Sequence, residues 1–143
     1  MVISIKNLDP PLGAEIDDVD VSKPLPQAEI DAIEAAWRER LVVVFHRQNL
    51  SDPQLIAFSN NFGELDPPGQ NPYGEPFNKA HPELNVISNV VENGKPIRNL
   101  GDGEAVWHAD MTYVDLPPKG GDLACAGGAA PGSGRQHLFR EYV

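Results

Sequence analysis

The chain has 143 residues, which is the length of one domain or of part of a larger one. Its 11 Lys and Arg residues against 21 Asp and Glu residues give a formal net charge of −10, which makes nucleic acids and anionic membrane surfaces poor partners. The 13 Gly and 14 Pro residues predict many turns and loops and exclude a simple helical bundle.

Two short strands are predicted near the N-terminus. Residues 2–5 alternate in the manner of a strand, and residues 13–19 form a second candidate. Pro10 and Pro11 interrupt the pattern between them.

An amphipathic helix is predicted over residues 27–40, because apolar residues recur there at steps of three and four while acidic residues occupy the other face. The periodic apolar positions are Ile30, Ile33, Trp37 and Leu41. The β-branched run at residues 41–45 follows at once, and it is typical of a strand that is buried on both faces.

A second helix is predicted to begin at Ser51. Ser51 with Gln54 three residues later forms a capping box, and Pro53 is tolerated in a first helical turn. Gly63 is expected to end this helix.

The second half of the chain is expected to be mostly β. Residues 63–82 contain five prolines and predict a long loop of the kind that is often functional. Residues 84–91 predict a strand, residues 92–95 a hairpin turn, and residues 105–114 a further strand. The predicted fold class is therefore α+β.

The candidate for chemistry is the motif Trp107-His108-Ala109-Asp110. On a strand, the period of two places the His108 imidazole and the Asp110 carboxylate on one face, close enough to bind one ion. With one further His, such a pair forms the facial triad of non-haem Fe(II) oxygenases. His81-Pro82-Glu83 has the same spacing but is less favoured, because its Pro lies at a loop-to-strand junction. A structural, hydrogen-bonded His108 is the alternative.

Several motifs also occur in one order along the chain. They are Gly13-Ala14-Glu15-Ile16, Leu41-Val42-Val43-Val44-Phe45, Leu50-Ser51-Asp52-Pro53-Gln54, Phe62-Gly63, and Trp107-His108-Ala109-Asp110-Met111 through Pro117-Pro118. Together they closely resemble the TauD/TfdA family of Fe(II)- and 2-oxoglutarate-dependent dioxygenases, over the N-terminal part of a family member at residues 1–120. The resemblance implies an incomplete double-stranded β-helix, a cupin-like jelly-roll, with N-terminal helices.

The resemblance also implies a function. By the family's pattern, His108 and Asp110 are catalytic residues and the first two iron ligands, and 2-oxoglutarate and O2 are co-substrates. The implied reaction hydroxylates a small organic acid, such as the sulfonate taurine in taurine catabolism, and releases succinate and CO2. Asn71 and Tyr73 fall where the family places substrate contacts, and an ordinary surface loop is the alternative. Full-length members of the family commonly form homo-oligomers.

Residues 121–143 form a low-complexity tail that is rich in Gly and Ala and departs from the family pattern. Permitted codons read one base later restore several family positions, including a Gly-Asp-x-Thr-like stretch, which predicts a frameshift near residues 119–123. A natural low-complexity tail is the alternative. The family's distal iron-binding His and 2-oxoglutarate-binding Arg have no counterpart in the chain, since His137 matches no family position. We therefore expect a truncated enzyme that is inactive alone.

A second class of function stays open. The chain could be a non-catalytic acidic α+β binding domain, or a pseudogene remnant, in which His108 and Asp110 are structural. Trp37 and Trp107 are interpreted as core aromatics rather than cofactor contacts. With Cys125 as the single cysteine and no apolar run of membrane-spanning length, we expect a cytoplasmic protein.

Overall fold

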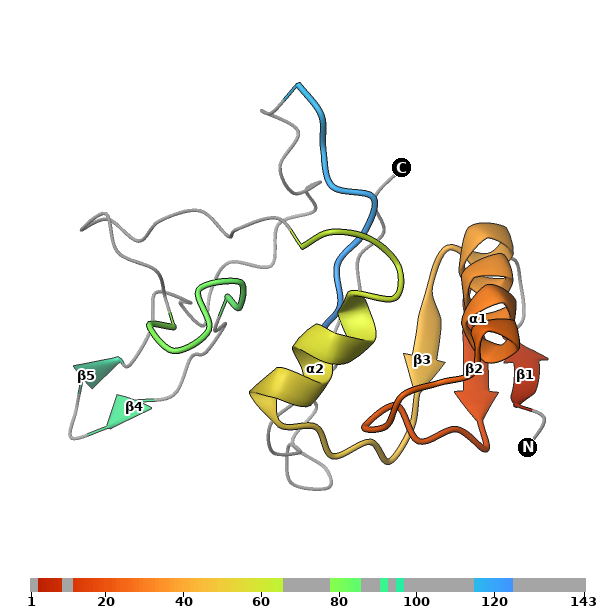
Figure 1. The fold of residues 1–143 in the computed structure, drawn as a ribbon, viewed down its shortest axis with the longest axis horizontal. Coiled ribbons are helices and arrows are strands. Elements are labelled where there is room, and N and C mark those ends of the chain that lie inside the picture. Colours follow the sequence, from red (N-terminus) through yellow and green to blue (C-terminus); the bar gives the residue numbers. More distant parts are fainter. Residues whose placement is uncertain are drawn as a thin grey trace.

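The structure is a computed structural model, and it describes residues 3–8, 12–65, 78–85, 91–92, 95–96 and 115–124. These residues form a three-stranded sheet of order β1-β2-β3, two helices, and a separate two-stranded hairpin (Figure 1). The elements are β1 (Ser4–Asn7), β2 (Ala14–Asp17), α1 (Gln27–Arg40), β3 (Val43–Phe45), α2 (Asp52–Ser59), β4 (Val91–Glu92) and β5 (Lys95–Pro96). The predicted combination of helices and strands in the first half is confirmed.

The sheet is built around a β2-α1-β3 crossover. β1 pairs antiparallel with β2, with Ile5 opposite Ile16, whereas β2 pairs parallel with β3, with Ala14 opposite Val43. Parallel neighbours need a long crossover connection, and α1 supplies it. Helix α1 packs against the face of the sheet that carries the buried Ala14 and Ile16 (Figure 1), and in the described part of the chain the opposite face, which carries the half-buried Glu15 and Asp17, is the more open one.

Helix α1 begins and ends where the periodicity predicts. Its buried side chains are Ile30, Ile33 and Ala36, while Trp37 is only half-buried. Leu41 was expected on the same apolar face, and this is wrong: it ends the helix with a φ of 68° and is 41% exposed. A non-glycine residue in the left-handed region turns the chain sharply, and here that turn sends the backbone from α1 into β3.

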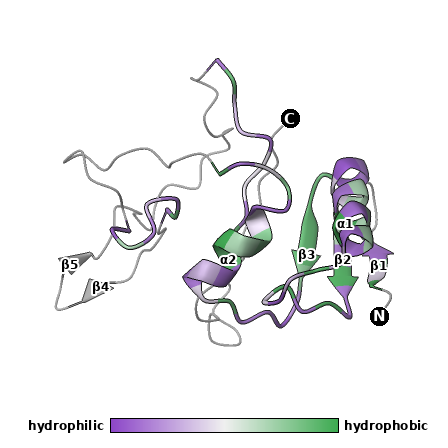
Figure 2. Cartoon of the chain, in the orientation of Figure 1, coloured by the Kyte–Doolittle hydropathy of each residue, from purple (hydrophilic) through white to green (hydrophobic). Residues whose placement is uncertain are grey.

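The core lies between the sheet, α1 and α2. Its buried members are Ile16, Val21, Ile33 and Phe58, and seven half-buried apolar side chains pack against them. Figure 2 shows β3 as hydrophobic while α1 mixes hydrophilic and hydrophobic residues. β3 was expected to be buried on both faces, but its three residues are half-buried because it lies at an edge of the described sheet.

The start of α2 follows its prediction and its end does not. The predicted capping box of Ser51 and Gln54 is present, with the Ser51 backbone N–H donating to Gln54 Oε1 at 2.9 Å, and Pro53 lies in the first turn. The helix ends at Ser59, before Gly63. Asn61 supplies the physical reason, because its side-chain amide donates to the carbonyl oxygens of Ala57 and Phe58 at 3.2 and 2.7 Å.

The second half is described in part. β4 and β5 pair antiparallel with Glu92 opposite Lys95, which confirms the predicted hairpin turn. The strand expected from residue 84 is wrong at its start, since Leu84 follows a turn and its N–H donates to the His81 carbonyl oxygen at 3.0 Å. The strand expected at residues 105–114 lies outside the described residues, and the jelly-roll stays a prediction. Neither helix in the described part has the length and apolar character of a membrane-crossing segment.

Candidate functional site

The predicted site residues His108, Asp110, Asn71 and Tyr73 all lie outside the described residues. Among the residues that the structure does describe, no three His, Cys, Asp or Glu side chains are grouped in a way that could hold a metal ion. The described residues therefore offer no competing metal centre.

The rival triplet at His81 can be examined directly. Asn78 Oδ1 accepts hydrogen bonds from the backbone N–H groups of Ala80 and His81, at 3.0 and 3.2 Å, and the chain turns between His81 and Leu84. His81 and Glu83 therefore lie in a turn rather than on a strand, so the period-two geometry that would place both side chains on one face does not apply.

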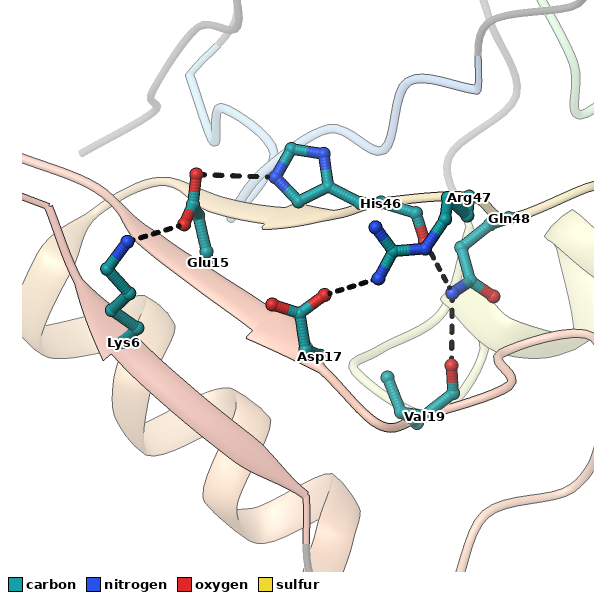
Figure 3. Close-up of polar contacts among 7 residues, drawn as sticks. All are labelled: Lys6, Glu15, Asp17, Val19, His46, Arg47 and Gln48. Carbon is teal, nitrogen blue, oxygen red and sulfur yellow. Dashed lines mark hydrogen bonds and ion pairs between the residues drawn. The ribbon is translucent and has the colours of Figure 1, made fainter.

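The open face of the sheet carries a row of charged side chains (Figure 3). Glu15 lies between Lys6 and His46, with Oε2 3.4 Å from Lys6 Nζ and Oε1 3.4 Å from His46 Nε2. The hydrogen bond from His46, followed by that from Lys6, holds the pKa of Glu15 below its ordinary value. The alternation that buries Ala14 and Ile16 points Glu15 and Asp17 to this face.

The same face continues into the turn after β3. Arg47 Nη2 lies 3.1 Å from Asp17 Oδ1, and Gln48 Nε2 donates to the carbonyl oxygens of Val19 and His46, each at 3.0 Å (Figure 3). The Arg47 and Asp17 side chains are 82% and 39% exposed, so water screens the pair and it adds little stability. These contacts join neighbouring strands to one another, and we assign no reaction to them.

A second group of contacts joins distant parts of the chain. We call residues 115–124 the strap, and Glu34 and Trp37 of α1 the seat. Lys119 Nζ lies 2.6 Å from Glu34 Oε1 and 5.6 Å from the centroid of the Trp37 ring, across a separation of 85 residues. Gly120 lies so close to the same ring that a Cβ atom there would overlap it. The strap therefore meets α1 through one charge contact and one close-packed contact.

The carboxylate of the seat is shared. Arg38 Nη2 lies 2.8 Å from the Glu34 Oε1 atom that Lys119 also contacts. The hydrogen bond from Lys119 and then that from Arg38 lower the pKa of Glu34. Glu34 thus stays ionised and contacts two cationic side chains, Arg38 of its own helix and Lys119 of the strap.

A shallow hollow beside the seat is too open to enclose a small molecule. It is lined by Asp31, Glu34, Ala35 and Arg38, which lie on the solvent side of α1. Sites that bind small molecules are concave and mostly apolar, with a few polar groups, whereas this lining is mainly charged. We do not assign a substrate to it.

Two of these arrangements escaped the sequence interpretation. The charged face of the sheet could have been found, because Lys6, Glu15 and Asp17 alternate with apolar residues along their strands. The contact between seat and strap could not, because no local pattern links residues that are 85 positions apart.

Comparison with known proteins gives consistent results. The sequence model of the family described as "Taurine catabolism dioxygenase TauD, TfdA family" matches residues 4–139. An alpha-ketoglutarate-dependent 2,4-dichlorophenoxyacetate dioxygenase from Cupriavidus pinatubonensis is 31% identical over 140 residues, covering 85% of this chain and 49% of the relative. An alpha-ketoglutarate-dependent sulfate ester dioxygenase from Pseudomonas putida is 32% identical, covering 86% of this chain and 36% of the relative. The chain thus spans half or less of the length of these relatives.

A solved structure agrees with the sequence comparison. A taurine dioxygenase from Burkholderia xenovorans matches with a TM-score of 0.53 and 35% identity, over 63% of this chain and 31% of that one. The likeness therefore extends to the backbone arrangement of the matched part.

Proposed function

The chain belongs to the TauD/TfdA dioxygenase family, and on this premise we propose that it forms the metal-binding N-terminal part of a 2-oxoglutarate-dependent dioxygenase. The observation that carries the proposal is the family match over residues 4–139, which includes the His108 and Asp110 motif. An imidazole nitrogen with a carboxylate oxygen is two thirds of the donor set of a facial triad, and this donor set fits Fe(II).

His108 and Asp110 would hold the metal, and each has a defined task. A neutral His108 offers one ring nitrogen to the ion, and the Asp110 carboxylate offsets part of the ionic charge. Iron bound there would couple the oxidative decarboxylation of 2-oxoglutarate by O2, which yields succinate and CO2, to hydroxylation of a substrate C–H bond. Asn71 and Tyr73 would bind the substrate by donating hydrogen bonds to an anionic head group.

We propose a small organic acid as the substrate. The names of the relatives include an aryloxyacetate and a sulfate ester, and the solved neighbour is a taurine dioxygenase. These molecules share an anionic head group, which is the feature that an amide and a phenol can recognise. The single cysteine supports a cytoplasmic enzyme. The family match supports homo-oligomers in the full-length form.

Metal binding tests the proposal without requiring turnover. Mn(II), which accepts oxygen and nitrogen ligands and is visible by electron paramagnetic resonance, would be titrated into the chain and into His108→Ala. We expect His108→Ala to lose most of the binding. The matched control is His81→Ala, which removes the histidine of the other His-x-acid triplet and should leave binding unchanged.

The same titration can contradict the proposal. Equal Mn(II) binding by His108→Ala and the unchanged chain would show that His108 is structural, and would favour the non-catalytic acidic domain. Loss of binding in His81→Ala alone would move the site to the other triplet.

For the substrate contacts, Tyr73→Phe should weaken the effect of an added sulfonate, aryloxyacetate or alkyl sulfate on the Mn(II) spectrum, while Tyr142→Phe should not.

A further inference from the structure

We propose that the strap is a latch, which Lys119 and Gly120 hold closed on the seat and which opens when the charge of Glu34 is removed or screened. The closed latch protects the peptide bond between Lys119 and Gly120, and the open latch exposes that bond to a protease that cleaves after lysine. The inference concerns described residues alone, so it does not depend on the proposed function.

The strap has the properties of a segment that proteases cut. It contains neither a helix nor a strand, and most of its residues are exposed. The side chains of Leu116 and Leu123, on either side of the contact, are 88% and 51% exposed, so their burial does not hold the strap in place. Exposed segments of this kind are preferred sites of proteolytic cleavage. The Lys-Gly bond in the middle of the strap is therefore a candidate cleavage site.

The Lys119 side chain cannot serve the seat and a protease at the same time. Its Nζ atom lies 2.6 Å from Glu34 Oε1 and 5.6 Å from the centroid of the Trp37 ring, where carboxylate and indole both attract it. A protease of the trypsin class takes the lysine side chain into a pocket that contains its own carboxylate. Cleavage after Lys119 therefore requires the ammonium group to leave the seat first.

The Gly120 backbone closes the other half of the latch. A Cβ atom at this position would overlap Cζ2 and Cη2 of Trp37, which are ring atoms that cannot move independently. Gly120 does not have the positive φ that favours glycine, so the requirement is for space alone. A protease must surround the chain on both sides of the bond that it cuts, and the Trp37 ring prevents this while Gly120 rests against it.

The seat is supported by the core, so opening moves the strap rather than the seat. The Trp37 ring meets Phe62 edge to face at 6.3 Å, Phe62 meets Phe58 at 5.2 Å, and Phe58 meets Phe45 at 5.4 Å. Edge-to-face pairs of this kind restrict the orientation of each ring.

The charge contact is weak enough for the latch to open reversibly. The Lys119 and Glu34 side chains are 51% and 28% exposed, so water and salt reach the pair. Glu34 Oε1 is also shared with Arg38 Nη2, at 2.8 Å. The closed form is therefore favoured by a modest ratio, and its population falls as salt is added.

Trypsin cleavage of the full 143-residue chain after Lys119 measures the opening of the latch. When opening and closing are fast, the cleavage rate follows the population of the open form. A synthetic peptide of residues 115–124 gives the rate for a permanently open strap, and each rate from the chain is divided by that of its own peptide. Cleavage after Arg40, at the end of α1, reports unfolding of the first half of the chain.

Two groups of variants separate charge from shape. We expect Glu34→Gln to speed relative cleavage after Lys119 about fivefold, because it removes the charge that holds the ammonium. Glu39→Gln, at an exposed position of the same helix, is the matched control and should have no effect. Gly120→Ala should speed relative cleavage at least as much, and adding Trp37→Phe, which removes the obstructing ring atoms, should recover most of that effect.

Salt tests the charge dependence without a mutation. Raising NaCl from about 0.1 M to about 1 M shortens the screening length from about 10 Å to about 3 Å. Relative cleavage of the unchanged chain should rise severalfold over this range, whereas that of Glu34→Gln should not.

Four outcomes would overturn the latch. The first is cleavage of the unchanged chain after Lys119 as fast as that of the peptide, and the second is equal rates for Glu34→Gln and Glu39→Gln. The third is a failure of Trp37→Phe to rescue Gly120→Ala. The fourth is cleavage after Lys119 that keeps pace with cleavage after Arg40 in every variant, because the strap would then open only when the chain unfolds.

Discussion

The guanidinium of Arg40, at the end of α1, donates a hydrogen bond of 2.6 Å to the carbonyl oxygen of Leu8, just after β1. Its Nε atom also donates to the Gly13 carbonyl oxygen at 3.3 Å, and the Gly13 N–H donates back to the Arg40 carbonyl oxygen at 2.8 Å. One side chain thus joins the crossover helix to the connection between β1 and β2. Arg40 therefore ties the end of α1 to the sheet through two backbone carbonyl groups.

Replacing Arg40 by Met keeps the aliphatic stem and removes these donors. Because two carbonyl oxygens in a part-buried setting lose a charged partner, we expect the free energy of unfolding to fall by about 1–3 kcal/mol. Urea unfolding measures the change. Arg38→Met is the control from the same helix, since that side chain is 69% exposed and its loss should cost little. Equal effects of the two variants would contradict the assignment.

Ile16 and Ile5 face each other across β1 and β2 but differ in burial, at 0% and 40% exposed. Ile16→Val removes a fully buried methyl group and should lower the free energy of unfolding by about 1 kcal/mol. Ile5→Val makes the same chemical change at a position that is 40% exposed, and it should lower the free energy of unfolding much less. Thermal and urea unfolding of the two variants would show this order, and a reversed order would mean that the core lies elsewhere.

The lowered pKa of Asp20 predicts a loss of stability in acid. Hydrogen bonds from Lys23 and Ser22 lower its pKa from 3.8 to about 2. A carboxyl group with a lower pKa in the folded chain stabilises the fold above its unfolded pKa, and this contribution is lost as the pH falls from 3.8 toward about 2. Carboxyl NMR should show a midpoint near 2 for Asp20, and Lys23→Gln should move it toward 3.8. A midpoint that Lys23→Gln does not move would reject the pairing.

Turnover is expected to be absent from the 143-residue chain. Two protein ligands hold a metal more weakly than three, and the sequence interpretation identifies only His108 and Asp110 as ligands among the printed residues. Succinate formation from 2-oxoglutarate, with Fe(II) and ascorbate present and a full-length family member as positive control, provides the assay. Steady succinate production by this chain would refute the expectation.

The coding DNA tests the proposed frameshift near residues 119–123. We expect a frame shifted by one base to continue into Gly-Asp-x-Thr and later to encode a His and an Arg of the family pattern. The family match reaches residue 139, so a frame confirmed as printed would instead make the tail a natural part of the chain. Sequencing from the Pro117 codon onward decides between the two.

Local patterns in the sequence were sufficient for several elements. The three- and four-residue steps at Ile30 and Ile33 place α1 at Gln27–Arg40, and the Asn-Gly turn places the β4-β5 hairpin. Such features depend on neighbours a few residues apart, so they can be read without knowing the fold. The end of α2 was mispredicted because the Asn61 side chain and the backbone N–H groups of residues 60–62 satisfy the last carbonyl groups before the chain reaches Gly63.

Contacts between distant residues were beyond the sequence. Nothing near Lys119 identifies Glu34 as its partner, and the parallel pairing of β2 with β3 depends on the whole path of α1. For the candidate site, His108 and Asp110 were identified by spacing and family pattern, and these residues lie outside the described part. Their role as ligands stays a prediction that the Mn(II) titration addresses.

The continuous β2-α1-β3 crossover also bears on how the chain is made. All of its strands and its helix are complete by Phe45, and α2 follows by Ser59, well before the ribosome reaches His108. Contacts that are close in sequence form fastest, and chains fold from the N-terminus during synthesis. The edge-to-face packing of Trp37, Phe62, Phe58 and Phe45 can therefore form while the second half is still being translated, so that the strap emerges onto a surface that already exists.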